Sequence, residues 1–299
     1  MTTAANTIEP AQMSFAQRDK IIDAALSDIS HIATLPEITL RIIELVENPN
    51  STAHDLHLVI ANDPALSARV LKVVNSAFYA LPGQIGSINR AIVLLGLNAV
   101  KNIAIAASLA KLFRGGRLCP QFAARDLWQH SIAVAAGVKL LGERIDLGLP
   151  DEAFLAGLIH DVGIMVEMQA RRAKLVQVFE RMEEHGECFR AAELKVFGVT
   201  HEHFGQALCQ KWKFPPFLGH VTGYHHRPLE LSEESRTIAC LTHVADVLAA
   251  RAGIGFAGTV DRKEIRTKVL DELKLTDQSL EEIERQLPDA IEVADSILS

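Results

Sequence analysis

The sequence predicts an all-α protein, and three observations lead to this prediction. Apolar residues recur at spacings of three and four along almost the whole chain, as they do on one face of a helix. Aromatic residues make up only 5% of the chain and β-branched residues rarely alternate, whereas the helix formers Ala and Leu are abundant. The 299 residues, 48% of them hydrophobic, are enough for one large core or two modest ones.

The first third of the chain predicts a series of helices separated by clear stop signals. Pro36 and the pair Asp63-Pro64 are start signals, and Glu47 to Asn50 form a stop. A loop from Asn75 to Gly83 interrupts the series, and Gly115, Gly116 and Pro120 end it and predict a subdomain boundary. The expected helices are Phe15 to Ile32, one from Pro36, two between Ser51 and Tyr79, Ile88 to Leu95, and a long Ala-rich helix that ends at Phe113.

A second helical set follows, and a charged amphipathic tail comes after it. In the tail, Thr276-Asp277 and Pro288 are predicted to start helices. The predicted organisation is an N-terminal helix (1–31), a helical part (32–116) packed on a second helical subdomain (120–250), and a C-terminal extension (261–299). The expected helices of the second set are Phe122 to Leu140, Asp151 to Ile159, Val162 to His185, Cys188 to Val196, Thr200 to Trp212, Pro216 to Tyr224 and Ser232 to Ala250.

Composition argues against several classes of function. The net charge is −7, the pI is near 5.9 and no block of Lys or Arg occurs, so no nucleic-acid partner is expected. The N-terminus lacks the apolar core of a secretory signal. The most apolar segment, Ala91 to Phe113, is interrupted by Asn98 and Lys101, which favours buried helices over a membrane span. We therefore expect a cytoplasmic protein without a membrane partner.

The four cysteines are consistent with this location. Cys119, Cys188, Cys209 and Cys240 lie far apart and form no CxxC pair. We expect reduced and mostly buried thiols.

The stretch from Ala156 to Gly163 is the most unusual part of the sequence, because a run of small and apolar residues ends in His160-Asp161. An imidazole beside a carboxylate is costly to bury unless both groups find a partner. A divalent metal ion would supply one, since His nitrogen and Asp oxygen are common metal ligands. The alternative is a His-Asp pair that closes a buried helix end.

Further residues of ligand type lie on the helices around this pair. His130 falls within a helix, His201 opens one, His225-His226 end one, and Asp246 lies inside an apolar helix. Taken singly, His130 can be a core residue, His201 a helix cap and His225-His226 a solvated helix end. Asp246 is the hardest to explain without a partner, because aspartate is rarely buried unless paired.

The ordered set His, His-Asp, His, His-His, Asp on consecutive helices resembles the HD superfamily of metal-dependent phosphohydrolases. Motifs in the first half resemble its HDOD branch, the HD-related output domains of bacterial signalling, and the resemblance covers about Ile32 to Ala250. These motifs are Leu35-Pro36, Asp63 to Leu66, Leu71 to Tyr79, Ile88 to Gly96, Phe197 to His201 and the segment from Trp212 to Pro216.

The resemblance implies a multi-helix HDOD fold and a centre for one or two divalent ions of Fe, Mn or Zn. In this arrangement Asp161 bridges the two ions, and it would be the catalytic residue if the protein were active. By the resemblance, one ion is held by His130, His160, Asp161 and Asp246, and the second by Asp161, His201, His225 and His226.

Two departures from the related HD-GYP enzymes imply regulation rather than catalysis. Ile164 stands where those enzymes have a lysine, and His226 is followed by Arg227-Pro228 rather than by a Gly-Tyr-Pro motif. An apolar side chain cannot donate a proton or stabilise charge on a phosphate. The resemblance therefore implies a catalytically inactive regulatory protein that contacts an unidentified signalling partner and has a nucleotide as a candidate ligand. The alternative is a metal-dependent phosphohydrolase that acts on a nucleotide or cyclic dinucleotide.

Several remaining residues receive minor roles. His243 lies one turn before Asp246 and is expected to orient a ligand residue. The loop Asn75 to Tyr79 is expected to pack the two halves together rather than to bind a partner. The remaining histidines are predicted to lie on the surface, and they are His54, His57, His185, His203 and His220.

Overall fold

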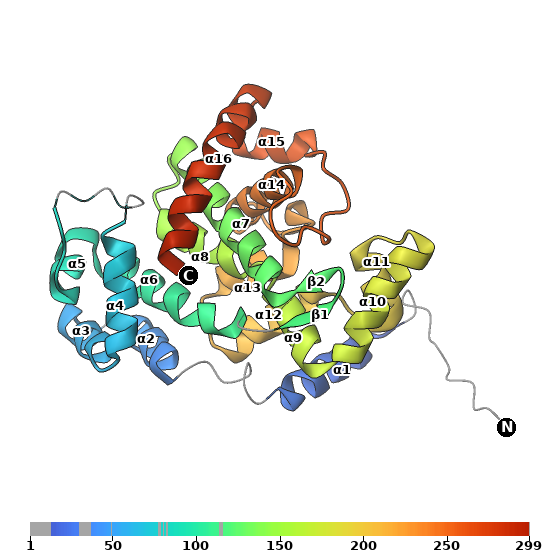
Figure 1. Ribbon diagram of the computed structural model, residues 1–299, viewed down its shortest axis with the longest axis horizontal. Helices are drawn as coiled ribbons and strands as arrows, with labels where there is room; N and C mark the ends of the chain where they lie inside the picture. The colour runs from blue at the N-terminus through green and yellow to red at the C-terminus, as the bar shows by residue number, and fades with distance from the viewer. Residues whose placement is uncertain are drawn as a thin grey trace.

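The protein is helical throughout, apart from one small hairpin, as the sequence predicts (Figure 1). The computed structural model describes residues 13–29, 37–48, 50–76, 79, 81, 83–113 and 116–298. The first helices are α1 (Phe15–Asp28), α2 (Glu37–Glu47), α3 (Ala53–Ala61), α4 (Pro64–Val74), α5 (Ile88–Leu95) and α6 (Leu97–Leu109), followed by a 3-10 turn (Ala110–Phe113).

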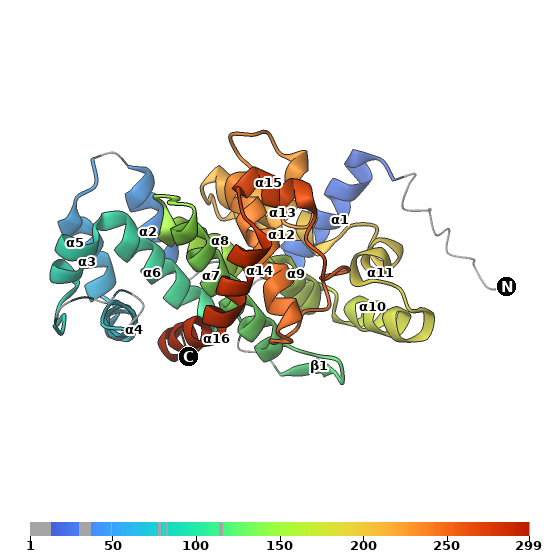
Figure 2. The same ribbon diagram turned by 90° about the horizontal axis from the view of Figure 1, so that it is seen from above.

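Helices α2 to α6 gather at one end of the molecule, and the later helices form the rest of it (Figures 1 and 2). A short antiparallel hairpin of β1 (Arg117–Cys119) and β2 (Phe122–Ala123) joins the two groups along the chain. The later helices are α7 (Ala124–Arg144), α8 (Pro150–Ile159), α9 (Val162–Ala170), α10 (Arg172–His185), α11 (Phe189–Val196), α12 (His201–Lys211), α13 (Pro216–Tyr224), α14 (Thr237–Arg251), α15 (Thr267–Leu273) and α16 (Asp277–Leu298).

Helix α7 is the central element of the second group and contacts α8, α14 and α16 (Figure 1). Its buried residues include Leu127, Ile132, Val134 and Val138, so apolar side chains face neighbours on several sides. A helix that is apolar around most of its circumference is typical of a core position. Helix α7 thus forms a rigid base for any group that it carries.

The Asn75 to Tyr79 loop is fixed by Asn75 within its own end of the molecule and is joined to the second helical group by Tyr79. The Asn75 side chain donates to the Ile85 carbonyl at 2.8 Å and accepts from the Ile85 amide at 2.6 Å. The Tyr79 hydroxyl donates to Asp151 Oδ1 at 2.7 Å, which links the loop to α8. The Tyr79 contact agrees with the packing role favoured above; residues 77, 78, 80 and 82 lie outside the described residues.

The expected helices and the observed ones differ in four places. Val162 to His185 is not one helix, because Arg171 (φ −140°, ψ 43°) separates α9 from α10. Pro288 does not start a helix but lies inside α16. Helix α14 begins at Thr237 rather than near Ser232, and the hairpin was not anticipated. The predicted start at Pro36 and the motif Leu35-Pro36 lie outside the described residues.

The apolar segments and the cysteines were expected to be buried, and the structure agrees only in part. Burial was predicted for Ala91 to Phe113. Ala99 to Leu109 of α6 are buried, whereas Val93 and Leu94 of α5 are exposed. Among the described residues, one stretch, Asp151–Ala170, is long and apolar enough to cross a membrane, and 83% of its apolar window is buried inside the protein, as in a core helix. Cys209 and Cys240 are buried, whereas Cys119 is half-buried and Cys188 is exposed, against the expectation of mostly buried thiols.

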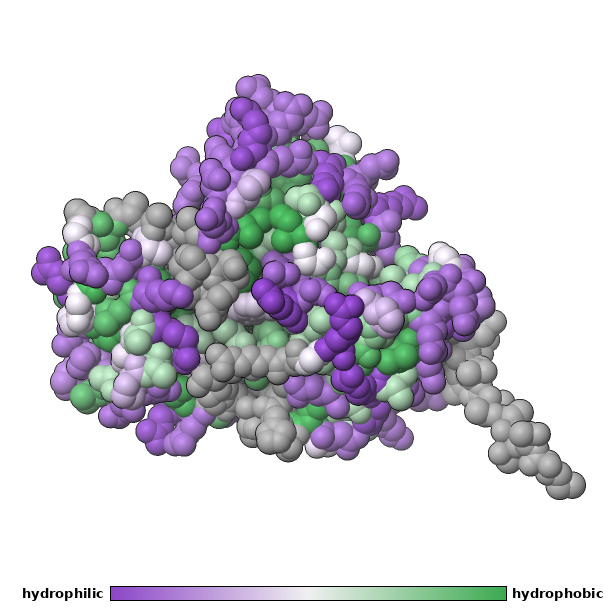
Figure 3. Space-filling view, in the orientation of Figure 1, coloured by the Kyte–Doolittle hydropathy of each residue, from purple (hydrophilic) through white to green (hydrophobic). Residues whose placement is uncertain are grey.

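On the face shown in Figure 3, hydrophilic residues cover the C-terminal helices and the end that carries α10 and α11. Hydrophobic residues are visible in the recess beside α16 and also over the end that carries α2 to α6. The outer face of α16 is therefore polar, and its buried residues include Leu280, Ile283 and Leu287.

Candidate metal centre

His160 and Asp161 lie at the junction of two helices. Helix α8 ends at Ile159, His160 is its C-cap, and Asp161 is the N-cap of α9. Both side chains are fully buried, and His160 Nε2 lies 3.3 Å from Asp161 Oδ2. The pair therefore sits inside the protein, where a charged carboxylate needs compensation.

The structure brings all seven predicted ligand residues together. His130 comes from the middle of α7, His201 is the first residue of α12, and Asp246 lies within α14. His225 and His226 directly follow α13. Two groups result, each with its candidate ligand atoms within 4.8 Å of one another. The groups are Asp161 with His201, His225 and His226, and His130 with His160 and Asp246.

Asp161 lies between the two groups. Its Oδ1 is 3.3 Å from Nε2 of His201 and 3.3 Å from Nε2 of His225, while its Oδ2 faces His160. Thr259 donates a hydrogen bond to Oδ2 at 3.3 Å. This is the position that a bridging carboxylate would occupy.

The ring nitrogens that face away from the centre donate to acceptors, and this determines the neutral tautomers. A carbonyl can only accept, so an Nδ1 bonded to one carries the hydrogen, and the Nε2 of the same neutral ring has a free lone pair. The bonds from Nδ1 to carbonyl oxygen that assign the tautomer are His160 to Gly157 (2.8 Å) and His225 to Val221 (3.2 Å). His130 has an acceptor on each ring nitrogen, Ile254 O at 3.3 Å and Asp246 Oδ1 at 2.9 Å.

In these tautomers the Nε2 lone pairs of His201 and His225 both face Asp161 Oδ1, each at 3.3 Å. His130 Nε2 is hydrogen-bonded to Asp246 Oδ1 at 2.9 Å. Four buried atoms of the centre have no hydrogen-bond partner among the described residues. They are His160 Nε2, Asp161 Oδ1, His225 Nε2 and Asp246 Oδ2.

These atoms fit a divalent cation. A buried acceptor without a hydrogen-bond partner lowers the stability of the fold by about 1–3 kcal/mol. A cation bound between these four atoms would offset that cost. Ligands that lie ~2.0–2.2 Å from a metal are separated by about 3.0–3.4 Å, close to the separations seen here. Imidazole and carboxylate donors suit Fe, Mn or Zn.

The ionisation of the two aspartates agrees with this fit. Burial by itself raises the pKa of Asp161, but His160, His225 and His201 outweigh it and hold the pKa well below its usual range. Burial likewise opposes ionisation of Asp246, yet His130 and His160 lower its pKa. Both side chains are therefore carboxylates, the form that binds metal.

Two close helix contacts position His201. A Cβ added at Gly163 of α9 would lie 1.9 Å from the His201 carbonyl oxygen, and one at Gly205 of α12 would lie 3.2 Å from the Thr222 Cβ. Gly163 is the second residue after the His-Asp pair. Its physical role is to let α9 and α12 touch, so that His201 reaches Asp161.

Sequence reasoning missed the carboxylates behind the ligands. Glu193 of α11 accepts from His201 Nδ1 at 2.9 Å and from the His201 backbone amide at 2.9 Å. Burial raises the pKa of Glu193 well above its usual value and, together with the charge of Glu193, does the same for the buried Glu167. The glutamate in the middle of the short helix Phe189–Val196 could have indicated a buried carboxylate. The sequence spacing alone could not show that this carboxylate contacts His201.

The remaining histidines behave in different ways. His243 Nδ1 donates to the His225 carbonyl at 2.9 Å, so it supports a ligand residue, although not Asp246 itself. His203 is not on the surface as predicted: it is half-buried and accepts a hydrogen bond from the Thr200 amide at 3.2 Å. His54 and His185 are exposed, whereas His57 and His220 are partly buried. Ile164 is fully buried.

Comparison with known proteins gives a family match. The model of the HDOD domain family matches residues 32–228. A curated protein of Treponema pallidum, described only as uncharacterized, is 24% identical over 79% of this chain and 46% of its own length. The chain thus spans about half the length of that relative.

Solved structures share the fold over nearly the whole chain. An HDOD domain protein of unknown function from Geobacter sulfurreducens has a TM-score of 0.79 and 26% identity, covering 95% of this chain and 99% of its own. A proposed phosphohydrolase from Shewanella amazonensis has a TM-score of 0.71 and 23% identity, with 92% and 98% covered. A proposed signal transduction protein from Marinobacter aquaeolei has a TM-score of 0.70 and 24% identity, with 99% and 66% covered.

Proposed function

Because the chain belongs to the HDOD family, we propose that it is a bacterial regulatory protein with a built-in metal centre. It binds one or two divalent ions of the Fe, Mn or Zn type and acts by contacting a signalling partner. The observation that carries the metal centre is the set of buried acceptor atoms on His160, Asp161, His225 and Asp246 that have no hydrogen-bond partner among the described residues.

Each residue of the centre has a definite task in this proposal. Asp161 holds the two groups together through its two oxygens, and His201 is fixed by Glu193 on its outer nitrogen. His225 is held from both sides, by Val221 on its Nδ1 and by His243 on its carbonyl. A bound ion would supply Lewis-acid stabilisation of a nearby anion.

Ile164 favours regulation over turnover. It is fully buried in α9, three residues after Asp161, and offers no proton to a leaving group. The signal transduction protein from Marinobacter aquaeolei is consistent in name with a signalling role.

A metal-dependent phosphohydrolase is the second candidate, because all seven ligand positions are filled and converge. Two solved structures of similar fold, both from Shewanella amazonensis, are named as proposed phosphohydrolases. In that case the substrate would be a nucleotide or cyclic dinucleotide.

Metal analysis tests the proposal. The protein is purified without chelator, reconstituted separately with Fe, Mn and Zn, desalted and measured by mass spectrometry. We expect about one to two equivalents in the wild type and in His185→Ala, an exposed control, and loss of metal in His160→Ala and Asp161→Asn. A wild type that stays empty after all three reconstitutions contradicts the proposal.

The same preparations separate the two candidate functions. They are incubated with cyclic di-GMP and with ribonucleotides, and the products are followed by chromatography. We expect no turnover. Hydrolysis that disappears in Asp161→Asn but persists in His185→Ala would replace the regulatory proposal by the phosphohydrolase.

A further inference from the structure

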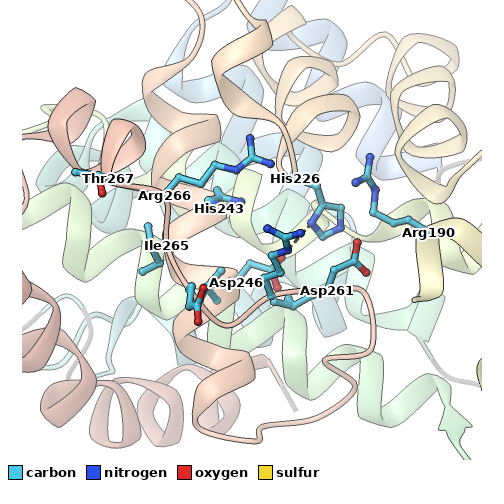
Figure 4. Close-up of a pocket in the computed structure, with 12 residues that line it drawn as sticks. Arg190, His226, His243, Asp246, Asp261, Ile265, Arg266 and Thr267 are labelled. Atoms are coloured by element: carbon cyan, nitrogen blue, oxygen red, sulfur yellow. Dashed lines mark ion pairs between the residues drawn. The ribbon is translucent and has the colours of Figure 1, made fainter. Parts of the chain in front are cut away.

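A cavity of about 420 Å³ opens beside the metal centre (Figure 4). His226 and Asp246, two of the candidate ligand residues, form part of its lining, so the cavity leads directly to the centre. The other walls come from α11, α14 and the segment 260–267 between α14 and α15. Its volume falls within the range of about 300–1,000 Å³ that is typical of small-molecule sites.

Three arginines, Arg190, Arg262 and Arg266, line the cavity. In Figure 4, Arg190 and Arg266 enter from opposite sides with His226 between them. The guanidinium group binds phosphate with two parallel hydrogen bonds, which makes such a cluster suited to a phosphate group.

Arg190 is held in place by a buried carboxylate. Glu202, whose side chain is fully buried, pairs with Arg190 at 2.7 Å and with Arg227 at 3.3 Å. Arg227 lines a small neighbouring pocket that shares His226, His243 and Arg266 with the main cavity. A single buried residue thus fixes two guanidinium groups at adjoining parts of the cleft.

Arg262 and Arg266 are exposed, and their side chains have no hydrogen-bond or ion-pair partner within the part of the chain that the structure describes. Both residues line the cavity, so their guanidinium groups are available to a ligand bound there.

The lining also carries three acids, Asp246, Asp261 and Glu264, as many as its arginines. Asp246 is hydrogen-bonded through Oδ1 to His130. A phosphate would therefore be held by direct hydrogen bonds from the guanidinium groups and not by a net positive charge of the lining. Val247, Val260 and Ile265 provide apolar wall for a carbon skeleton.

We propose that this cavity binds a small phosphate-bearing ligand of mononucleotide size, with its phosphate held by Arg190, Arg262 and Arg266 next to His226. The inference rests on the proposed function in that the metal centre forms one side of the site. Arg262 and Arg266 lie beyond residues 32–228, the part matched by the family model, so the C-terminal segment of this chain completes the site.

The test uses isothermal titration calorimetry on the full chain, both metal-free and reconstituted. The probes are inorganic phosphate and the four ribonucleoside monophosphates. We expect binding by the wild type and a loss of affinity of about ten-fold or more in the double variant Arg262→Ala/Arg266→Ala. The matched control is Lys263→Ala/Lys268→Ala, which removes the same charge from the same segment but from residues outside the lining. It should change the affinity by about two-fold or less.

Each outcome decides the proposal. Loss of affinity in the arginine variant alone supports it in either metal state, while the metal content of the same samples reports separately on the proposed function. Absence of binding by the wild type in both states, or equal losses in the two double variants, overturns it. At least one nucleoside monophosphate must bind more tightly than inorganic phosphate; if none does, the assignment of a mononucleotide-sized ligand is wrong.

Discussion

Glu193 shows how a residue that binds no ligand itself can determine the quality of the centre. Its carboxylate accepts from both His201 Nδ1 and the His201 amide, which fixes the ring and directs Nε2 toward Asp161. We predict that Glu193→Gln lowers metal affinity by about 10- to 100-fold, because a neutral amide polarises the imidazole less. Competition with a chromophoric chelator measures the change.

Glu187→Gln is the control for this variant. Glu187 pairs with Arg181 and Lys195, and these contacts lower its pKa to about 2, but it touches no ligand residue. It should keep the wild-type affinity. Equal affinity of Glu193→Gln and wild type would show that His201 does not require a carboxylate, as opposed to an amide, on its outer nitrogen.

At the scale of residues, the seven candidate ligand residues could be selected from the sequence, and the residues around them could not. His160, Asp161 and Asp246 are noticeable because polar ligand types interrupt apolar helices, and such residues need partners. Arg262 and Arg266 lie in a charged, exposed segment in which nothing distinguishes them from Lys263 and Lys268. Only the folded chain shows which of these cations line the cavity.

Among the elements, the contact of α9 with α12 depends on the absence of a side chain at Gly163. Since an added Cβ would lie 1.9 Å from the His201 carbonyl oxygen, we predict that Gly163→Ala destabilises the protein by about 3 kcal/mol or more. Urea unfolding measures the loss. Gly86→Ala, where an added Cβ meets nothing within 4 Å, should be close to neutral; similar losses in both variants would contradict the packing argument.

The start of α12 gives a pH-dependent prediction. His203 Nδ1 accepts from the Thr200 amide, and burial, followed by the charge of Arg227, lowers the pKa of His203 to about 4. The unfolded chain takes up this proton near pH 6.5, so it binds more protons than the folded chain between pH 6.5 and 4. This part of the stability is therefore complete above pH 6.5 and is lost as the pH falls toward 4.

His203→Gln isolates the effect, because glutamine at this helix position can still accept from the Thr200 amide but does not titrate. Between pH 7 and pH 4 the wild type should lose about 3 kcal/mol more unfolding free energy than the variant, at 1.36 kcal/mol per pKa unit. Denaturant unfolding at both pH values measures this difference. Parallel pH profiles of the two proteins would contradict the assignment to His203.

Most helices could be predicted from periodicity, and the exceptions have tertiary causes. No Gly or Pro lies at the break between α9 and α10, so the sequence does not predict it. At the break the Arg171 guanidinium pairs with Asp28 of α1, a contact that only the folded chain shows. Pro288 normally ends a helix, yet α16 continues through it because Leu280, Ile283 and Leu287 are buried on the same helix. The start of α4 was predicted correctly. The Asp63 side chain accepts hydrogen bonds from the amides of Ala65 and Leu66, as the Asp63-Pro64 pair predicts.

For the whole molecule, the C-terminal helix is part of the core and not an appendage. Helix α16 packs along α7, the helix that carries His130, and Leu287 is 1% exposed and reaches Gly137 of α7. The predicted division into an HD-like part and a separate extension remains a prediction, but the packing ties the stability of the two together. A smaller side chain at this contact should therefore make the part of α7 that carries His130 less stable.

Leu287→Ala tests this coupling. We predict a loss of about 2–5 kcal/mol of unfolding free energy, because the truncation leaves a cavity against α7. Hydrogen exchange should rise in α7 around His130 as well as in α16, since the two helices share one buried layer. Gln286→Ala, at the neighbouring exposed position, should leave both measurements unchanged. Faster exchange confined to α16 would show instead that the helix opens independently of the metal centre.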